Sequence, residues 1–223
     1  MTGPLPAGRL LLVRHGQSEA NVALRLDSLP PGAPLTGDGQ EQARVLVETL
    51  ADTPVSAVLA SRATRAQQTA APLAASLGLD VEVVDGVQET FVGDLEGQAG
   101  WPVLEEYDRA YGQWFAGSPG VRPPGGESGT EVLDRYLPVV AHLRARLEAD
   151  PQRSVVLVSH GAAIRWVTTS VSDVPAAFAV STHLANTELV VLAPVGAQGW
   201  VCERYGPHVP PFLAVDTTVA PPV

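Results

Sequence analysis

The amino-acid sequence predicts an α/β fold, a three-layer α/β/α sandwich with a mostly parallel central sheet. Six short segments resemble strands, and several of them are continuously apolar, which is typical of strands covered on both faces. Segments with helical periodicity lie between them, and this alternation favours a parallel sheet. The strand-like segments are 9–13, 56–61, 81–84, 154–159, 188–193 and 200–205.

Four helices are expected between these strands. The first follows Thr36, a good N-cap residue, and the second runs from Arg65 to Leu77, where Gly78 is well placed to end it. The other two cover about 130–147 and 162–171. In each, apolar residues recur every three or four positions, so that one face can pack on the sheet.

Residues 91–127 interrupt this alternation. They hold six of the twelve aromatic residues and end in "SPGVRPPGGESG", a composition typical of a loop. We expect a small helical or loop insertion over the active edge of the sheet. Residues 1–206 then form one domain, and the Pro-rich residues 207–223 form an extended tail.

Composition excludes several classes of function. The net charge is −10, and all 14 basic residues are arginine, so a nucleic-acid partner is not expected. No apolar run is long enough to span a membrane or to act as a signal peptide, which predicts a cytoplasmic protein. A single cysteine, Cys202, excludes an internal disulfide.

The candidate catalytic arginines and histidines follow the ends of predicted strands. Arg14 and His15 follow the first strand, His160 and Gly161 follow "SVVLVS", and Arg65 lies shortly after "SAVLAS". Ligands of open α/β sheets bind just outside the carboxyl ends of the strands. Guanidinium groups that converge with imidazoles there would suit a dianion such as phosphate.

A neutral imidazole in such a site can attack phosphorus and form a phosphohistidine. The leaving alkoxide then needs a proton, and Glu89, after the strand at 81–84, is the best-placed carboxylic acid. The five histidines lack the spacing of metal ligands, so no metal and no other cofactor is expected.

The segment "LLVRHGQSEAN" (11–21) resembles the signature of the histidine phosphatase superfamily, in the branch of the phosphoglycerate mutases and related phosphatases. Four more segments are similar to motifs of that family and occur in the family's order. They are "PLTGDGQEQA" (34–43), "SRATRAQQTA" (61–70), "QETFVGDLEG" (88–97) and "LVSHGAAIR" (157–165).

The resemblance implies roles for seven residues. His15 would be the nucleophile and Glu89 the proton donor. The other five would contact the transferring phosphoryl group: Arg14, Asn21, Arg65, His160 and Gly161. Ser18 either caps the next helix or touches phosphate. The remaining candidates are interpreted as structural or solvated: Arg62, Asp94, Glu96, His142, His183 and His208.

The resemblance leaves three functions open. A mutase of this family uses a cluster of basic residues in the insertion, whereas here the interval 89–126 holds only Arg109 and Arg122. Its aromatic residues would instead suit an ester with an apolar group, although packing within the insertion explains any single ring equally well. We therefore expect a metal-independent phosphatase of small-molecule phosphomonoesters, in a family where homodimers are common. The alternatives are a phosphoglycerate mutase and, less in keeping with the intact motifs, a non-catalytic ligand-binding member.

Overall fold

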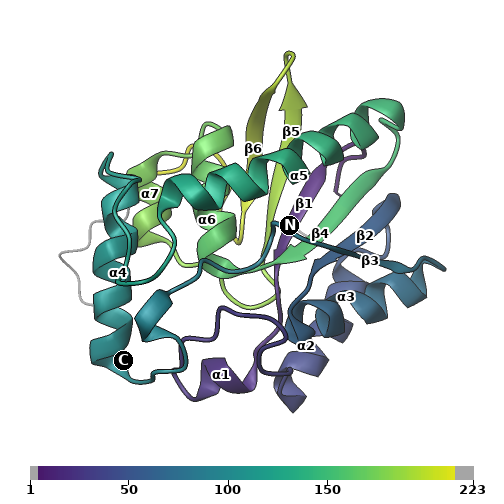
Figure 1. The fold of residues 1–223 in the computed structure, drawn as a ribbon. Helices are drawn as coiled ribbons and strands as arrows, with labels where there is room; N and C mark the ends of the chain where they lie inside the picture. Colours follow the sequence, from purple (N-terminus) through teal and green to yellow (C-terminus); the bar gives the residue numbers. More distant parts are fainter. Residues whose placement is uncertain (1–4, 214–223) are drawn as a thin grey trace.

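A six-stranded mixed sheet separates two helical layers in the computed structural model, which describes residues 5–213 (Figure 1). The strand order is β3-β2-β4-β1-β5-β6. Strands β1 to β4 pair in parallel, whereas β5 is antiparallel to β1 and β6 is antiparallel to β5. The strands are β1 (Leu10–Arg14), β2 (Val55–Ser61), β3 (Val81–Val84), β4 (Ser154–Ser159), β5 (Leu189–Val195) and β6 (Gly199–Tyr205).

All six predicted strands are present, and the three-layer fold is confirmed. Side chains on a strand point alternately to its two faces, so a continuous apolar run supplies two cores. In β1, Leu10 and Leu12 pack under α5 (Gly129–Ala149) and α6 (Gly161–Val171). Leu11 and Val13 face α2 (Gly37–Thr49) and α3 (Thr64–Ser76) on the opposite side.

The four predicted helices are α2, α3, α5 and α6. The Thr36 hydroxyl accepts a hydrogen bond from the Gly39 N–H (3.0 Å), which caps α2 as expected. Gly78 follows α3 with φ +67°, a left-handed conformation that glycine adopts without steric cost. Two further short helices, α1 (Glu19–Val22) and α7 (Ala176–Ser181), were not predicted.

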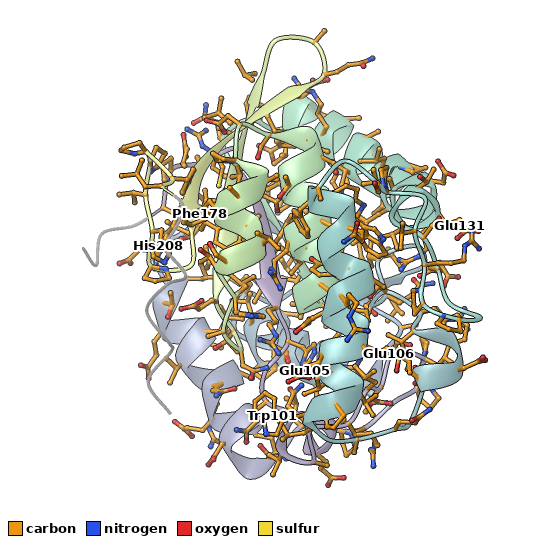
Figure 2. All side chains as sticks on the ribbon, turned by 90° about the vertical axis from the view of Figure 1, so that its left-hand side faces the viewer. Trp101, Glu105, Glu106, Glu131, Phe178 and His208 are labelled. Atoms are coloured by element: carbon orange, nitrogen blue, oxygen red, sulfur yellow. The ribbon has the colours of Figure 1, made fainter. Side chains whose placement is uncertain are left out.

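The insertion contains a short 3₁₀ turn, η1 (Gly93–Leu95), and the helix α4 (Trp101–Phe115). Most of its aromatic rings pack together: Tyr111 and Trp114 are buried and contact Trp166 of α6 or each other. Trp101, at the start of α4, is instead 66% exposed (Figure 2). These rings therefore pack the insertion onto the rest of the domain, so packing explains them better than contact with a substrate does.

The described part of the Pro-rich tail packs against the domain. Phe212 is buried and lies against Phe178 of α7, with ring centroids 5.1 Å apart, and His208 meets the same Phe178 ring edge to face (Figure 2). The predicted extended tail beyond residue 213 lies outside the described residues. Within residues 5–213, no helix has both the length and the apolar character that a membrane crossing requires.

Candidate active site

The parallel strands β1, β2 and β4 end at one edge of the sheet, and their register brings the candidate residues together. Arg14 pairs with Ser159, and the His15 N–H donates to the Ser159 carbonyl (3.0 Å). As a result His15 and His160, which follow β1 and β4, lie side by side, with ring centroids 5.1 Å apart. Arg65 reaches the same place from the first turn of α3, directly after β2.

Hydrogen bonds at both ring nitrogens define the tautomer of His15. The Nε of Arg65, which can only donate, lies 3.1 Å from His15 Nε2, so Nε2 carries the lone pair. The proton therefore sits on Nδ1, which donates to the Gly16 carbonyl (2.7 Å). This is the tautomer that the nucleophilic role requires, with its lone pair on the nitrogen that faces the arginines.

Each imidazole accepts a hydrogen bond from an N–H of Arg65, which can only donate, so each ring is neutral. Burial, together with the positive charges of Arg65 and Arg14, lowers the pKa of His15 well below its usual value. Burial and the charge of Arg65 lower the pKa of His160 in the same way. His160 Nδ1 accepts from Arg65 Nη2 (3.3 Å), and its Nε2 then donates to the Ser61 hydroxyl (2.8 Å).

Arg65 is held in place by an aspartate that sequence reasoning missed. Its side chain is 3% exposed, and Nη1 pairs with the Asp27 carboxylate (3.1 Å) while Nη2 donates to the Asp27 carbonyl (2.6 Å). The same carboxylate accepts from the Ala33 N–H (2.8 Å). Asp27 lies in a loop with no periodic pattern, so no sequence signal marks it.

Arg14 supplies a second guanidinium. Its Nη1 donates to the Leu184 carbonyl (2.6 Å), but its buried Nε has no hydrogen-bond partner among residues 5–213. Gly161 makes room for it, because a Cβ on that residue would lie 3.2 Å from Arg14 Nε. An unpaired N–H of a buried cation is costly, and a bound anion would satisfy it.

Glu89 approaches the site from the loop after β3, with its side chain against the N-terminus of α6. Its carboxylate accepts N–H donors from Thr90 (2.9 Å), Ala162 (3.2 Å) and Ala163 (3.0 Å). These bonds fix the position of the carboxyl group next to Gly161. The Glu89 side chain is therefore held by the second and third residues after His160.

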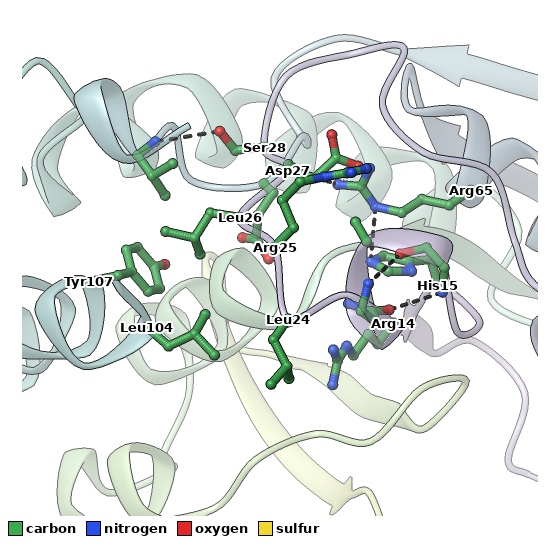
Figure 3. A pocket seen from close by; sticks show the side chains of 15 residues that line it. Arg14, His15, Leu24, Arg25, Leu26, Asp27, Ser28, Arg65, Leu104 and Tyr107 are labelled. Carbon is green, nitrogen blue, oxygen red and sulfur yellow. Dashed lines mark hydrogen bonds and ion pairs between the residues drawn. The ribbon is translucent and has the colours of Figure 1, made fainter. Parts of the chain in front are cut away.

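One cavity of about 290 Å³, with two unlike ends, is lined by the predicted site residues Arg14, His15, Asn21, Arg65 and Glu89 but not by His160 or Gly161 (Figure 3). The polar end holds Arg14, His15 and Arg65. Apolar side chains form the other end, and Tyr107 is the one aromatic ring of the insertion that lines the cavity. The apolar residues are Ala20, Leu24, Leu26, Val92 and Leu104.

The remaining predictions have mixed outcomes. Asn21 lines the cavity, and Ser18 caps α1 in a reciprocal capping box with Asn21. Arg62 pairs with Asp85 at the surface, as expected for a residue outside the site. The prediction that Glu96 is solvated is wrong: its carboxylate accepts from the Ser28 N–H (2.9 Å) and from the Ser28 hydroxyl. Glu96 thus ties the 3₁₀ turn to the loop that carries Asp27.

Asn186 was not predicted as part of the site. Its side-chain amide donates to the His15 carbonyl (2.9 Å) and to Asn21 Oδ1 (3.3 Å), and so links the loop before β5 to the nucleophile. Across the described residues no group of three or more histidine, cysteine, aspartate or glutamate side chains could hold a metal ion. Positive charge at the site comes from arginine.

Paired arginines and a neutral, oriented histidine define a phosphoryl-transfer site on this fold, and the comparison with known families agrees. The model of the histidine phosphatase superfamily, branch 1, matches residues 10–207, and the chain belongs to this family. The fold and the family predicted from sequence are thereby confirmed.

Its relatives include proteins with two different names. The chain is 30% identical to the probable phosphoglycerate mutase GpmB of Cronobacter sakazakii over 202 residues, 89% of this chain and 92% of the relative. It is 34% identical to the glucosyl-3-phosphoglycerate phosphatase of Mycolicibacterium vanbaalenii over 173 residues, 75% of each. A solved mycobacterial glucosyl-3-phosphoglycerate phosphatase in complex with VO3 superposes with a TM-score of 0.77 at 30% identity, covering 89% of this chain and 98% of that one.

Proposed function

We propose that the protein is a phosphatase that hydrolyses small-molecule phosphomonoesters through a phosphohistidine on His15. One observation carries this proposal: the lone pair of His15 Nε2 faces Arg65 Nε, beside the unpartnered Nε of Arg14. A phosphoryl group placed there would take over the N–H of Arg65 Nε from His15 Nε2, which frees the lone pair to attack phosphorus, and would also accept from Arg14 Nε.

Two steps complete the reaction. First, His15 Nε2 attacks phosphorus, the bond from phosphorus to the ester oxygen breaks, and Glu89 in its protonated form gives its proton to the leaving alkoxide. In the second step a water molecule attacks the phosphohistidine. Glu89, now a carboxylate, takes a proton from that water, and phosphate leaves with the imidazole again neutral.

The basic residues of the insertion favour a phosphatase over a mutase. Arg109 and Arg122 lie at a separate hollow on the surface, with Glu106 and Gln113, and Arg122 pairs with Glu131. Neither lines the cavity, where Arg25 is the one arginine besides Arg14 and Arg65. A mutase has to hold the acid group of a phosphoglycerate and exclude water, and the apolar far end is poorly suited to that task.

A panel of phosphomonoesters, assayed beside a phosphoglycerate mutase assay, tests this function. We expect release of inorganic phosphate from several esters, with kcat/KM highest for leaving groups that bear apolar surface. The panel should include 3-phosphoglycerate and glucosyl-3-phosphoglycerate, because relatives carry those names. Interconversion of phosphoglycerates faster than phosphate release would favour the mutase. Binding of esters without either reaction would favour the non-catalytic alternative.

Activity is expected to need no divalent cation. Arg14 and Arg65 already supply the positive field at the phosphoryl position. After exhaustive treatment with EDTA, kcat/KM for p-nitrophenyl phosphate should match that of the untreated protein. Orthovanadate should inhibit as a trigonal-bipyramidal mimic of the transferring group. Loss of activity on chelation with recovery on adding Mg²⁺ or Zn²⁺ would disprove the metal-independent mechanism.

A further inference from the structure

Arg135 of α5 donates three of its five guanidinium N–H groups to the segment around Glu89 and the other two to Glu127. Its Nη1 donates to the carbonyls of Gly86 (2.8 Å) and Gln88 (2.9 Å), and Nη2 donates to the carbonyl of Glu89 itself (3.0 Å). The two remaining donors form a bidentate pair with the Glu127 carboxylate at 2.7 and 2.8 Å. Five donors thus meet five acceptors, an unusually complete use of the guanidinium.

Glu127 secures the same segment from its far side. Besides pairing with Arg135, its carboxylate accepts from the Phe91 N–H (2.8 Å), and its own N–H donates to the Phe91 carbonyl (2.9 Å). The main chain is therefore tied just before Glu89, at Glu89 and two residues after it. Both charged side chains are largely buried, at 17% and 22% exposed, which strengthens the pair relative to one in water.

The close approach of this segment to α5 has a steric basis. Gly86 has φ +86°, and a Cβ on it would lie 2.4 Å from the Arg135 carbonyl oxygen. Only glycine lets the chain turn at that distance from the helix. Arg135 does not line the cavity, so it cannot contact a substrate there.

We propose that Arg135, with Glu127, is a positioning residue that sets the location of the Glu89 carboxyl relative to the leaving oxygen. This inference rests on the proposed function, in which Glu89 is the proton donor. Misplacement of a catalytic group by about 1 Å can cost roughly 10²-fold in rate. Loosening the contacts of Arg135 should therefore impair the steps in which Glu89 transfers a proton, and the first of these, proton donation to the leaving oxygen, is the one that kcat/KM reports.

The test compares the loss of kcat/KM that a substitution causes on two substrates, one with a poor and one with a good leaving group. Arg135→Lys keeps the positive charge but has three donors on one nitrogen and cannot span three carbonyls and a carboxylate. For an alkyl phosphate, whose alkoxide leaves poorly, kcat/KM should fall roughly 10-fold or more. For p-nitrophenyl phosphate, whose phenolate leaves without help, it should change less than about threefold. Glu127→Gln should likewise lower the ratio of kcat/KM for the alkyl phosphate to kcat/KM for p-nitrophenyl phosphate. It replaces Arg135→Lys as the test variant if Arg135→Lys does not fold.

Arg146→Lys is the matched control. Arg146 lies on the same helix and forms a bidentate pair with Glu82 at 2.7 and 2.9 Å, away from the segment around Glu89. Arg146→Lys should leave the ratio of the kcat/KM values for the two substrates unchanged. Equal losses on both substrates with Arg135→Lys, or no loss on either, would overturn the proposal in favour of a purely structural role.

A double-mutant cycle gives a second readout. If Arg135 acts through Glu89, adding Arg135→Lys to Glu89→Gln should cost nothing further on the alkyl phosphate. The inference would be contradicted if Arg135→Lys lowered kcat/KM by the same factor in the Glu89→Gln variant as in the wild type. A wild-type protein that hydrolyses no ester would refute the proposed function instead. If Glu89→Gln lowers kcat/KM more on the alkyl phosphate than on p-nitrophenyl phosphate and Arg135→Lys does not, only the role of Arg135 is refuted.

Discussion

His15→Ala is expected to abolish hydrolysis of phosphomonoesters. Its imidazole is the neutral nucleophile of the proposed reaction, and alanine offers no lone pair at that position. Removal of a nucleophile can cost up to roughly 10⁶-fold in kcat. The measurement is kcat/KM for p-nitrophenyl phosphate together with thermal unfolding. The fold should survive, because the ring lies at the end of β1 and outside the main apolar clusters.

Covalent labelling gives the same prediction a direct readout. Brief incubation with a ³²P-labelled ester should attach an acid-labile, base-stable phosphate to His15, and the variant should carry none. A label on serine or on a carboxylate would contradict the mechanism. Because burial and nearby arginines lower the pKa of His15, labelling should persist at pH 6. An imidazole of ordinary pKa would be about three-quarters protonated there and would lose rate in proportion.

Glu89→Gln should reduce the rate of phosphoenzyme formation from an alkyl phosphate by about 10²–10⁴-fold, the usual contribution of a general acid. The amide keeps the shape of the side chain and can still accept from the N–H groups of Ala162 and Ala163, but it has no proton to give. With p-nitrophenyl phosphate the loss should be much smaller. Rapid-quench measurement of the labelled intermediate with each substrate separates the two cases.

Equal losses on both substrates would mean that Glu89 acts through its charge alone and that the proton has another source. Asp94→Asn is a suitable control, because Asp94 lies in the same segment, is exposed and does not line the cavity. It should leave both rates near those of the wild type. A larger effect at Asp94 than at Glu89 would reassign the proton donor.

The sequence by itself determined the layered fold and the edge of the sheet where chemistry is possible. The apolar run of β1 predicts a strand buried on both faces, and Arg14 and His15 follow it directly. The same argument places His160 after β4. These inferences work because side-chain periodicity and strand ends are local features, and parallel strands that share a sheet deliver their ends to one edge.

Only the tertiary structure decided which contacts hold these residues in place. Asp27 lies 38 residues from Arg65, and Arg135 lies 46 to 49 residues from the carbonyls that it binds. Arg135 did carry a weak signal, since it is a charged residue beside the buried Val132 and Tyr136 of α5. Its partners are backbone carbonyls of an irregular segment, and such acceptors leave no mark in the sequence. These carbonyls reach the Arg135 guanidinium only in the folded protein, where α5 packs across one face of the sheet. That packing sets the distance between α5 and the segment that carries Glu89.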